Sequence, residues 1–382
     1  MGPLAGVRVV EFAGNGPVPM CAMILADMGA RVLRIERPGR DDLGMARPPA
    51  LDFTARNRDS LAPDLKTPAG RALVAALIGE ADALIECFRP GVMERLGLGP
   101  EPCLASNPRL VAGRLRGGGR PGPRPRGAGH PLTSTAPRGA GGAAGGGGGP
   151  PAPPLNLVGD YGGGALHMAA GLLGALLHVA RGGAGQVVEV SILGGADALM
   201  TATYGLHAAG LHGGARGTNV SDSGAPFYDV YECADHGYVS VAALEKKFRA
   251  TLFARLGLDA AWVGESDRRE RWPELREKMA AIFRTRSRDA WCALLEGTDA
   301  CFAPVLSMAE APAHPQNRAA ENFIQVGGAL QPAPGPRFSR TVPPPPRPPE
   351  APGAGGVAAL RAWGWAEDRI TALGVPALGG TG

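Results

Sequence analysis

The chain has 382 residues, which is enough for one large domain or two ordinary ones. Its formal net charge of +4 is small for this length and argues against a dedicated nucleic-acid binder. None of the six cysteines forms a CxxC pair or has metal-site spacing with a histidine. We therefore predict reduced thiols, a cytoplasmic location and no bound metal.

The sequence also predicts no membrane association. The N-terminus lacks the basic and apolar regions of a secretory signal. The best candidate for a membrane-crossing segment, residues 165–180, is short and contains His167 and His178. The C-terminal Gly-Gly-Thr-Gly resembles no peroxisomal or lipidation signal.

The first elements predict a βαβ unit, with strands at 7–13 and 31–36 around a helix at 21–28. Residues 14–19 begin like a dinucleotide-binding loop but lack its third glycine. Pro17 and Pro19 also remove backbone donors that a pyrophosphate would need. We therefore predict a structural turn before the helix, although Glu36 at the second strand end would suit NAD.

The alternation of helix and strand continues along the chain. The further elements predicted for this part are a helix at 68–79, a strand at 82–88, a short helix at 91–97, a strand at 109–115, a helix at 162–180, a strand at 186–192 and a helix at 195–209. The later elements predicted are a hairpin of 228–233 and 237–242, helices at 245–256, 272–284 and 287–296, an extended Pro-rich segment at 331–353 and a final helix at 355–373.

The predicted fold class is α/β: a Rossmann-like large domain with a mostly parallel sheet, plus a smaller α+β domain. The large domain is expected at 1–215 and the small one at 216–325. Residues 326–382 are expected to return to the large domain.

Two residues stand out as candidates for chemistry. Asp160 ends an apolar run and is followed by Gly162–Gly164 and a long apolar helix. Such an aspartate is either an N-cap or a functional carboxylate, and the glycines would let a substrate approach the backbone. Free N–H groups at the same helix start could stabilise an oxyanion. His130 follows Gly129 in a Gly-rich stretch, where a loop histidine is the plainer interpretation.

Several segments together carry a family resemblance, and their order and spacing are more specific than any one of them. They are 9–14, 26–30, 35–38, 64–66, 88–92, 154–160, 224–228, 243–245 and 298–301. The chain resembles the alpha-methylacyl-CoA racemases of the family III CoA-transferase (CaiB/BaiF-like) superfamily over nearly its whole length. The resemblance implies the family III CoA-transferase fold and an interlocked homodimer, with each site between the large domain of one subunit and the small domain of the other.

The resemblance implies inversion of the α-carbon of a 2-methylacyl-CoA thioester through an enolate, in lipid metabolism. Such a reaction needs one acid/base group on each face of the carbon. His130 and Asp160 match these two groups, Glu245 matches the glutamate that pairs with the histidine, and Asn156 matches an active-site asparagine. The expected partner is an acyl-CoA substrate, with no metal or redox cofactor.

The resemblance also implies a set of CoA-binding residues, in which Arg and Lys suit the phosphates. The matching positions are Arg37, Pro63, Asp64, Leu65, Lys66, Arg89 and Gly129. Two other functions stay open. One is a CoA-transferase with Asp160 as the nucleophile that forms an aspartyl-CoA anhydride. The other is an inactive CoA-binding paralogue, in which the cations are ordinary surface charges.

Residues 131–150 depart from the family pattern and are of low complexity. In the family the histidine is followed by Asp-Ile-Asn, whereas Leu132-Thr133-Ser134-Thr135 stands near this position here. Asp-Ile-Asn codons read one base out of register encode Thr-Ser-Thr, so we hypothesise a compensated frameshift; a genuine flexible insertion is the alternative. Tryptic peptides would test whether the protein carries these residues. The hypothesis fails if the gene holds no Asp-Ile-Asn codons in the alternate frame.

Overall fold

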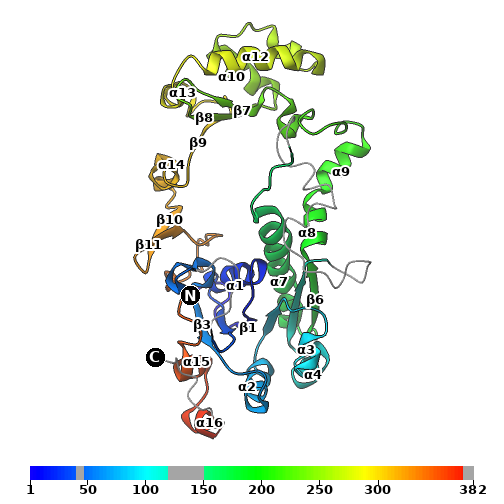
Figure 1. Cartoon of the computed structure of the whole chain (residues 1–382), viewed down its shortest axis with the longest axis vertical. Coiled ribbons are helices and arrows are strands. Elements are labelled where there is room, and N and C mark those ends of the chain that lie inside the picture. The colour runs from blue at the N-terminus through cyan, green and yellow to red at the C-terminus, as the bar shows by residue number, and fades with distance from the viewer. Residues whose placement is uncertain (40–46, 119–149, 373–382) are drawn as a thin grey trace. The chain divides into compact units, whose positions relative to one another are not determined.

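The computed structural model describes residues 1–39, 47–118 and 150–372. These residues form two compact units (Figure 1). The large unit contains 1–39, 47–118, 155–199 and 321–372, and the small unit contains 150–154 and 200–320. This division places the boundaries at 199/200 and 320/321, somewhat earlier than the boundaries expected from the sequence.

The large unit is built on one parallel sheet of six strands in the order β3-β2-β1-β4-β5-β6. The strands are β1 (Arg8–Phe12), β2 (Arg31–Ile35), β3 (Arg58–Leu61), β4 (Ala83–Glu86), β5 (Val111–Arg116) and β6 (Gln186–Ser191). The strand order reverses between β1 and β4. In open α/β sheets, ligands bind beyond the carboxyl ends of the strands at such a reversal.

Helices cover both faces of this sheet, because alternate strand residues point to opposite sides. Val10 packs in a core with Leu77 and Trp363, whereas Val9 packs in a second core with Leu25 and Leu172. The helices of the large unit are α1 (Pro17–Asp27), α2 (Pro68–Gly79), α3 (Val92–Arg95), α4 (Pro100–Ser106), the π-helix η4 (Leu157–Leu166), α7 (His167–Ala180), α8 (Ile192–Leu199), α15 (Gly356–Trp363), α16 (Glu367–Ala372) and the short 3₁₀ helices Pro49–Leu51 and Phe53–Ala55.

Several predicted helices have different limits. Helix α1 begins at Pro17 instead of residue 21, because proline has a helical φ and its missing N–H is not needed in the first turn. The final helix is divided into α15 and α16 by Gly364, which has a φ of 107°. The helix predicted at 195–209 is likewise two helices, α8 and α9 (Thr201–Ala208).

The helix predicted at 162–180 also begins earlier, at Leu157, and this changes the membrane prediction. Leu157–Ala180 spans 24 residues and contains an 18-residue window with a mean hydropathy of 1.4, so its length and composition would suit a membrane crossing. Nevertheless, 44% of this apolar window is buried, and a core helix of a folded domain passes the same test. The expectation that no apolar run is long enough to cross a membrane was therefore wrong with respect to length.

The small unit contains an antiparallel sheet in the order β7-β8-β9, and the predicted hairpin forms its first two strands. Its core stacks Tyr231 on Phe283, which also meets the edge of Trp291. The strands are β7 (Tyr228–Glu232), β8 (Tyr238–Ala242) and β9 (Phe302–Val305). The helices, besides α9, are the π-turn Val220–Gly224, α10 (Lys246–Leu256), α11 (Trp262–Glu265), the 3₁₀ helix Arg269–Arg271, α12 (Trp272–Phe283), α13 (Arg288–Leu295), the 3₁₀ helix Ala311–Ala313 and α14 (Pro315–Ala319).

The return segment is anchored to the large unit. It starts with a hairpin of β10 (Phe323–Val326) and β11 (Ala329–Pro332). The buried guanidinium of Arg56 donates to the Gln331 side chain at 2.9 Å and to the Pro332 carbonyl at 2.8 Å. Arg347 and Asn57 then exchange backbone and side-chain hydrogen bonds. The Pro-rich stretch is thus attached next to β3.

Candidate functional site

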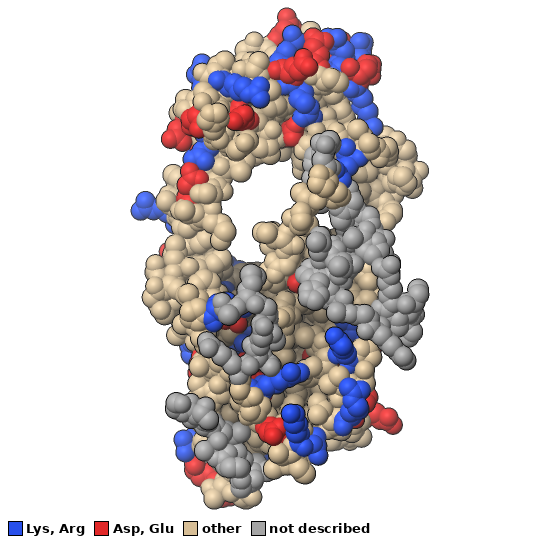
Figure 2. Space-filling view, in the orientation of Figure 1, with Lys and Arg blue, Asp and Glu red and all other residues tan. Residues whose placement is uncertain are grey.

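The predicted CoA-binding residues follow the carboxyl ends of neighbouring parallel strands. Arg37 follows β2, residues 63–66 follow β3, and Arg89 follows β4. Since these strand ends meet at one edge of the sheet, the fold brings all three loops to that edge. The side chains of Arg37, Lys66 and Arg89 are exposed there. Figure 2 shows Lys and Arg side chains on the surface of the large unit, with acidic side chains among them.

The loop after β3 is held by hydrogen bonds around Asp64. Its carboxylate accepts the Lys66 N–H at 2.9 Å, and its carbonyl accepts the Thr67 hydroxyl at 2.8 Å. The Thr67 hydroxyl in turn accepts the Gly70 N–H at 3.0 Å and so caps α2. The Arg71 guanidinium donates to the carbonyls of Leu65 and Lys66. Asp64 and Leu65 therefore shape a loop that presents Lys66, while Pro63 is buried.

Asp160 lies in the first turn of η4 and is only 5% exposed. The N-cap position belongs to Asn156, so the N-cap alternative for Asp160 was wrong. The Tyr161 N–H donates to the Asn156 carbonyl at 3.0 Å, the five-residue spacing of a π-helix. Such turns occur frequently at functional sites. A buried carboxylate costs free energy unless the surroundings stabilise its charge, which makes Asp160 a candidate for function.

The Asp160 carboxylate contacts the turn between β1 and α1. A Cβ atom added to Gly16 would lie 2.7 Å from Oδ2 and 3.1 Å from Cγ of Asp160. Similarly, a Cβ added to Gly14 would lie 2.5 Å from the Cys87 sulfur, just beyond β4. The carboxylate therefore lies at the carboxyl edge beside β1 and β4, where the strand order reverses.

The Cys87 thiol in this site is neutral. Burial raises its pKa to about 12, and the nearby carboxylates of Glu86, Glu11 and Asp160 act in the same direction. A protonated thiol is a poor nucleophile. Cys87 is therefore a packing neighbour of the site and not a reactive group.

A buried ion pair lies next to this turn. Glu11 on β1 is fully buried and accepts from the Arg58 Nε at 3.0 Å. The same guanidinium donates to the Pro19 carbonyl in the first turn of α1 at 2.9 Å. Arg34 lies beside the pair, and its Nε is 3.1 Å from the Glu36 carboxylate. Burial raises the pKa of Glu36, although Arg34 opposes this shift. The charges thus connect β1, β2 and β3 to the start of α1.

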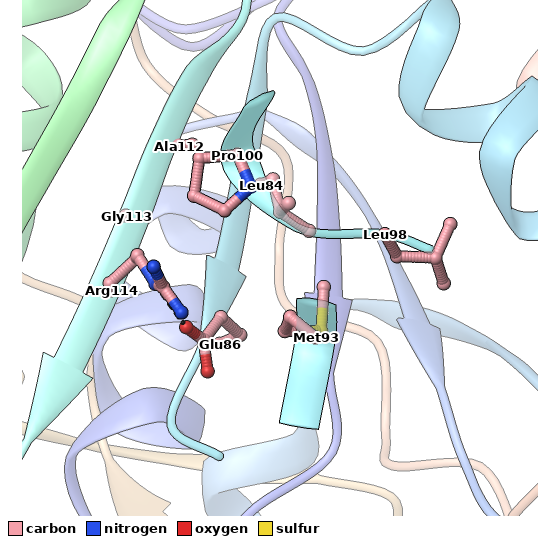
Figure 3. A pocket seen from close by; sticks show the side chains of 8 residues that line it. All are labelled: Leu84, Glu86, Met93, Leu98, Pro100, Ala112, Gly113 and Arg114. Carbon is pink, nitrogen blue, oxygen red and sulfur yellow. Dashed lines mark hydrogen bonds and ion pairs between the residues drawn. The ribbon is translucent and has the colours of Figure 1, made fainter. Parts of the chain in front are cut away.

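A small pocket lies nearby among β4, β5 and α3 (Figure 3). Glu86 and Arg114 point toward each other there and form a hydrogen bond of 2.8 Å. Burial raises the pKa of Glu86, while the Arg114 bond lowers it. The pocket volume of about 10 Å³ admits at most one water molecule, so an acyl-CoA does not fit it.

Two further predicted catalytic residues, Glu245 and His130, do not belong to the described part of the large unit. Glu245 belongs to the small unit, where it is exposed at the N-cap position of α10. Its charge raises the pKa of Cys301, after the larger effect of burial. His130 and Gly129 lie outside the described residues. The proposed pairing of Glu245 with His130 stays a prediction, as does the role of Asn156.

Sequence reasoning did not identify Gly14, Gly16 or Cys87 as neighbours of Asp160. The glycine pair was visible, but it was interpreted only as a turn. Across the described ranges, no group of three His, Cys, Asp or Glu side chains is placed to hold a metal ion.

Comparison with known proteins places the chain in a family. The model of CoA-transferase family III matches residues 4–356, so the chain belongs to this family. It is 40% identical to mouse alpha-methylacyl-CoA racemase over 373 residues, which cover 97% of this chain and 96% of the mouse protein. It is 38% identical to the human racemase over 322 residues, covering 84% of this chain and 82% of the human one. The predicted family is confirmed.

Solved structures agree on the fold. A CaiB/BaiF family protein from Brucella suis matches with a TM-score of 0.78 at 24% identity, over 94% of this chain and 99% of that one. Rv3272 from Mycobacterium tuberculosis matches with a TM-score of 0.78 at 25% identity and the same coverage. The predicted α/β class and the family III CoA-transferase fold are therefore confirmed.

Proposed function

We propose that the protein is an isomerase that inverts the α-carbon of 2-methylacyl-CoA thioesters. The observation that carries this proposal is the 40% identity to a racemase along 97% of the chain. The position of Asp160 supports it, because a buried carboxylate lies at the edge of the sheet where the fold class binds its ligands.

The proposed reaction is a proton transfer with two groups. One group removes the α-proton to form an enolate, and a second group delivers a proton to the opposite face. We assign these roles to Asp160 and His130, which exchange them when the direction reverses. Glu245 would hold the histidine ring in one tautomer and favour its charged form. Asn156 would help to hold Asp160.

CoA recognition is proposed at the same edge of the sheet. Arg37, Lys66 and Arg89 are exposed on loops after β2, β3 and β4, and their cations suit phosphate groups. The backbone at Gly129 and the loop of Pro63, Asp64 and Leu65 would complete the binding site. Since the protein itself supplies both acid/base groups, we propose that the reaction uses no further cofactor.

We also propose a cytoplasmic homodimer. Exposed apolar side chains on helices of the large unit support the dimer, because exposed apolar patches mark protein interfaces. The leucines that are at least half exposed there are Leu157, Leu166, Leu177 and Leu199. The free cysteines among the described residues suit a reducing compartment. Sedimentation equilibrium tests the dimer: a mass of twice 39.1 kDa is expected, and a monomer at micromolar concentration would contradict it.

The function is tested with a chiral 2-methylacyl-CoA in D2O. Exchange of the α-proton with loss of chirality is the expected result. Transfer of CoA to a free acid without exchange would instead identify a CoA-transferase. Tight binding of the thioester with neither reaction would identify an inactive paralogue.

A further inference from the structure

The turn Gly14-Asn15-Gly16 is enclosed by side chains of two other segments. On one side, a Cβ at Gly14 would meet the Cys87 sulfur at 2.5 Å. On the other, a Cβ at Gly16 would meet the Asp160 carboxylate at 2.7 Å. Real Cβ atoms do not approach other heavy atoms so closely. The turn therefore has its present contacts only because both positions are glycine.

Gly16 is required by the backbone as well. Its φ of 69° and ψ of −112° are unfavourable for residues with a Cβ. The turn is fixed from behind, because Pro17 starts α1 and Arg58 holds the Pro19 carbonyl at 2.9 Å. A side chain at Gly16 would thus displace Asp160 more readily than it would displace this anchored turn.

The turn also provides a favourable potential for the carboxylate. Gly16 is the N-cap of the 11-residue helix α1, and the N-terminal end of a helix dipole favours a negative charge beside it. Pro17 and Pro19 have no N–H group, so the start of α1 offers few donors to a phosphate. The turn suits a side-chain carboxylate better than a dinucleotide.

We propose that Gly16 is a positioning residue: it sets how closely Asp160 approaches the β1–α1 turn and so fixes the reacting carboxylate at the carboxyl edge. This inference rests on the proposed function. It adds a residue that acts through another, because Gly16 would determine the position of the Asp160 carboxylate.

The kinetic test compares Gly16→Ala with Gly6→Ala. Gly6 also has a positive φ, 91°, but a Cβ there would have no described neighbour within 4 Å, and it precedes β1 at the opposite edge. Because a shift of about 1 Å can cost about 100-fold in rate, Gly16→Ala should lower kcat for α-proton exchange by about that factor while KM changes less than about twofold. Gly6→Ala should leave both constants unchanged.

Two results of this test are distinguishable. If the wild type exchanges its substrate and Gly16→Ala keeps kcat within about threefold, the inference is wrong. If the wild type does not exchange, the proposed function is wrong, and Gly16 is then judged by stability alone.

The stability test is a double-mutant cycle of thermal unfolding with Asp160→Ala. The loss of Tm caused by Gly16→Ala should be clearly smaller in the Asp160→Ala background, because the carboxylate that the new methyl group would meet is gone. Gly6→Ala should cause the same change in both backgrounds. Equal losses for Gly16→Ala in the two backgrounds would overturn the inference, whatever the activity.

Discussion

At the scale of single residues, the site depends on a carboxylate that is buried and yet close to the edge of the sheet. Asp160 is in contact with Gly16, and its neighbour across the turn is the neutral thiol of Cys87. In the proposed mechanism, the Asp160 carboxylate is therefore the acid/base group on this side of the site. The exposed Lys66 and Arg89 are the cations that we propose to bind the phosphates of CoA.

The Cys87 thiol gives a prediction about pH. In the folded protein the pKa of this thiol, about 12, lies above the ordinary value of 9.0. The contribution of the protonated thiol to folding stability is therefore complete below about pH 9 and is lost as the pH rises toward 12. Urea unfolding of the wild type and of Cys87→Ala gives the unfolding free energy of each protein at each pH. Between pH 8 and pH 10, the wild type should lose about 1 kcal/mol of unfolding free energy relative to Cys87→Ala. A difference that stays constant over this range would show that burial does not raise the thiol pKa.

Lys66 gives a prediction about substrate binding. If its cation contacts a CoA phosphate, Lys66→Met should raise KM at least about tenfold and change kcat little, because one charge-assisted hydrogen bond is worth about 1.5–3 kcal/mol. The matched control is Lys278→Met on α12 of the small unit, whose side chain is 45% exposed. Steady-state kinetics with both variants decide this, and an unchanged KM for Lys66→Met would remove Lys66 from the CoA site.

At the scale of elements, η4 and α8 pack with their backbones in contact. A Cβ on Gly195 would overlap the carbonyl of Gly163, and a Cβ on Gly163 would lie 2.7 Å from the Ala196 nitrogen. The helix that carries Asp160 is therefore supported from behind by α8. Because the residues at this helix crossing are small, η4 can pack closely against α8 in the large unit.

This packing predicts opposite effects of two helical glycine substitutions. Gly195→Ala should destabilise the protein by about 1–3 kcal/mol through overpacking, and it should also lower kcat because η4 moves. Gly174→Ala on α7 should stabilise it by up to about 1 kcal/mol, since a Cβ there meets no described atom within 4 Å. Urea unfolding measures both, and equal effects would contradict the close contact of η4 with α8.

At the scale of the whole molecule, periodicity predicted most of the described helices and strands. The helix at Pro68–Gly79 and the hairpin of β7 and β8 form as expected. Strand β3 was missed because Arg58, Asp59 and Ser60 give no apolar pattern, although the buried Arg58 is paired with Glu11. An ion pair between distant positions leaves no periodic signal in one sequence.

The candidate site was predictable only in part, because contacts between distant positions leave no periodic signal. Asp160 was visible from its local pattern and from the family resemblance. Its contact with Gly16 was not, because it joins positions far apart in the chain through the parallel sheet. The relation of Glu245 and His130 to Asp160 rests on the resemblance alone, since His130 lies outside the described residues.

The most direct measurement of the central claim is α-proton exchange by Asp160→Asn. We use Asp289→Asn as a control, because that carboxylate is 91% exposed on the small unit. With a chiral 2-methylacyl-CoA in D2O, wild type and Asp289→Asn should exchange the α-proton and lose chirality at similar rates. Asp160→Asn should lose at least about 100-fold in rate, because an amide neither accepts nor donates this proton. Racemisation by Asp160→Asn at the wild-type rate would contradict the account.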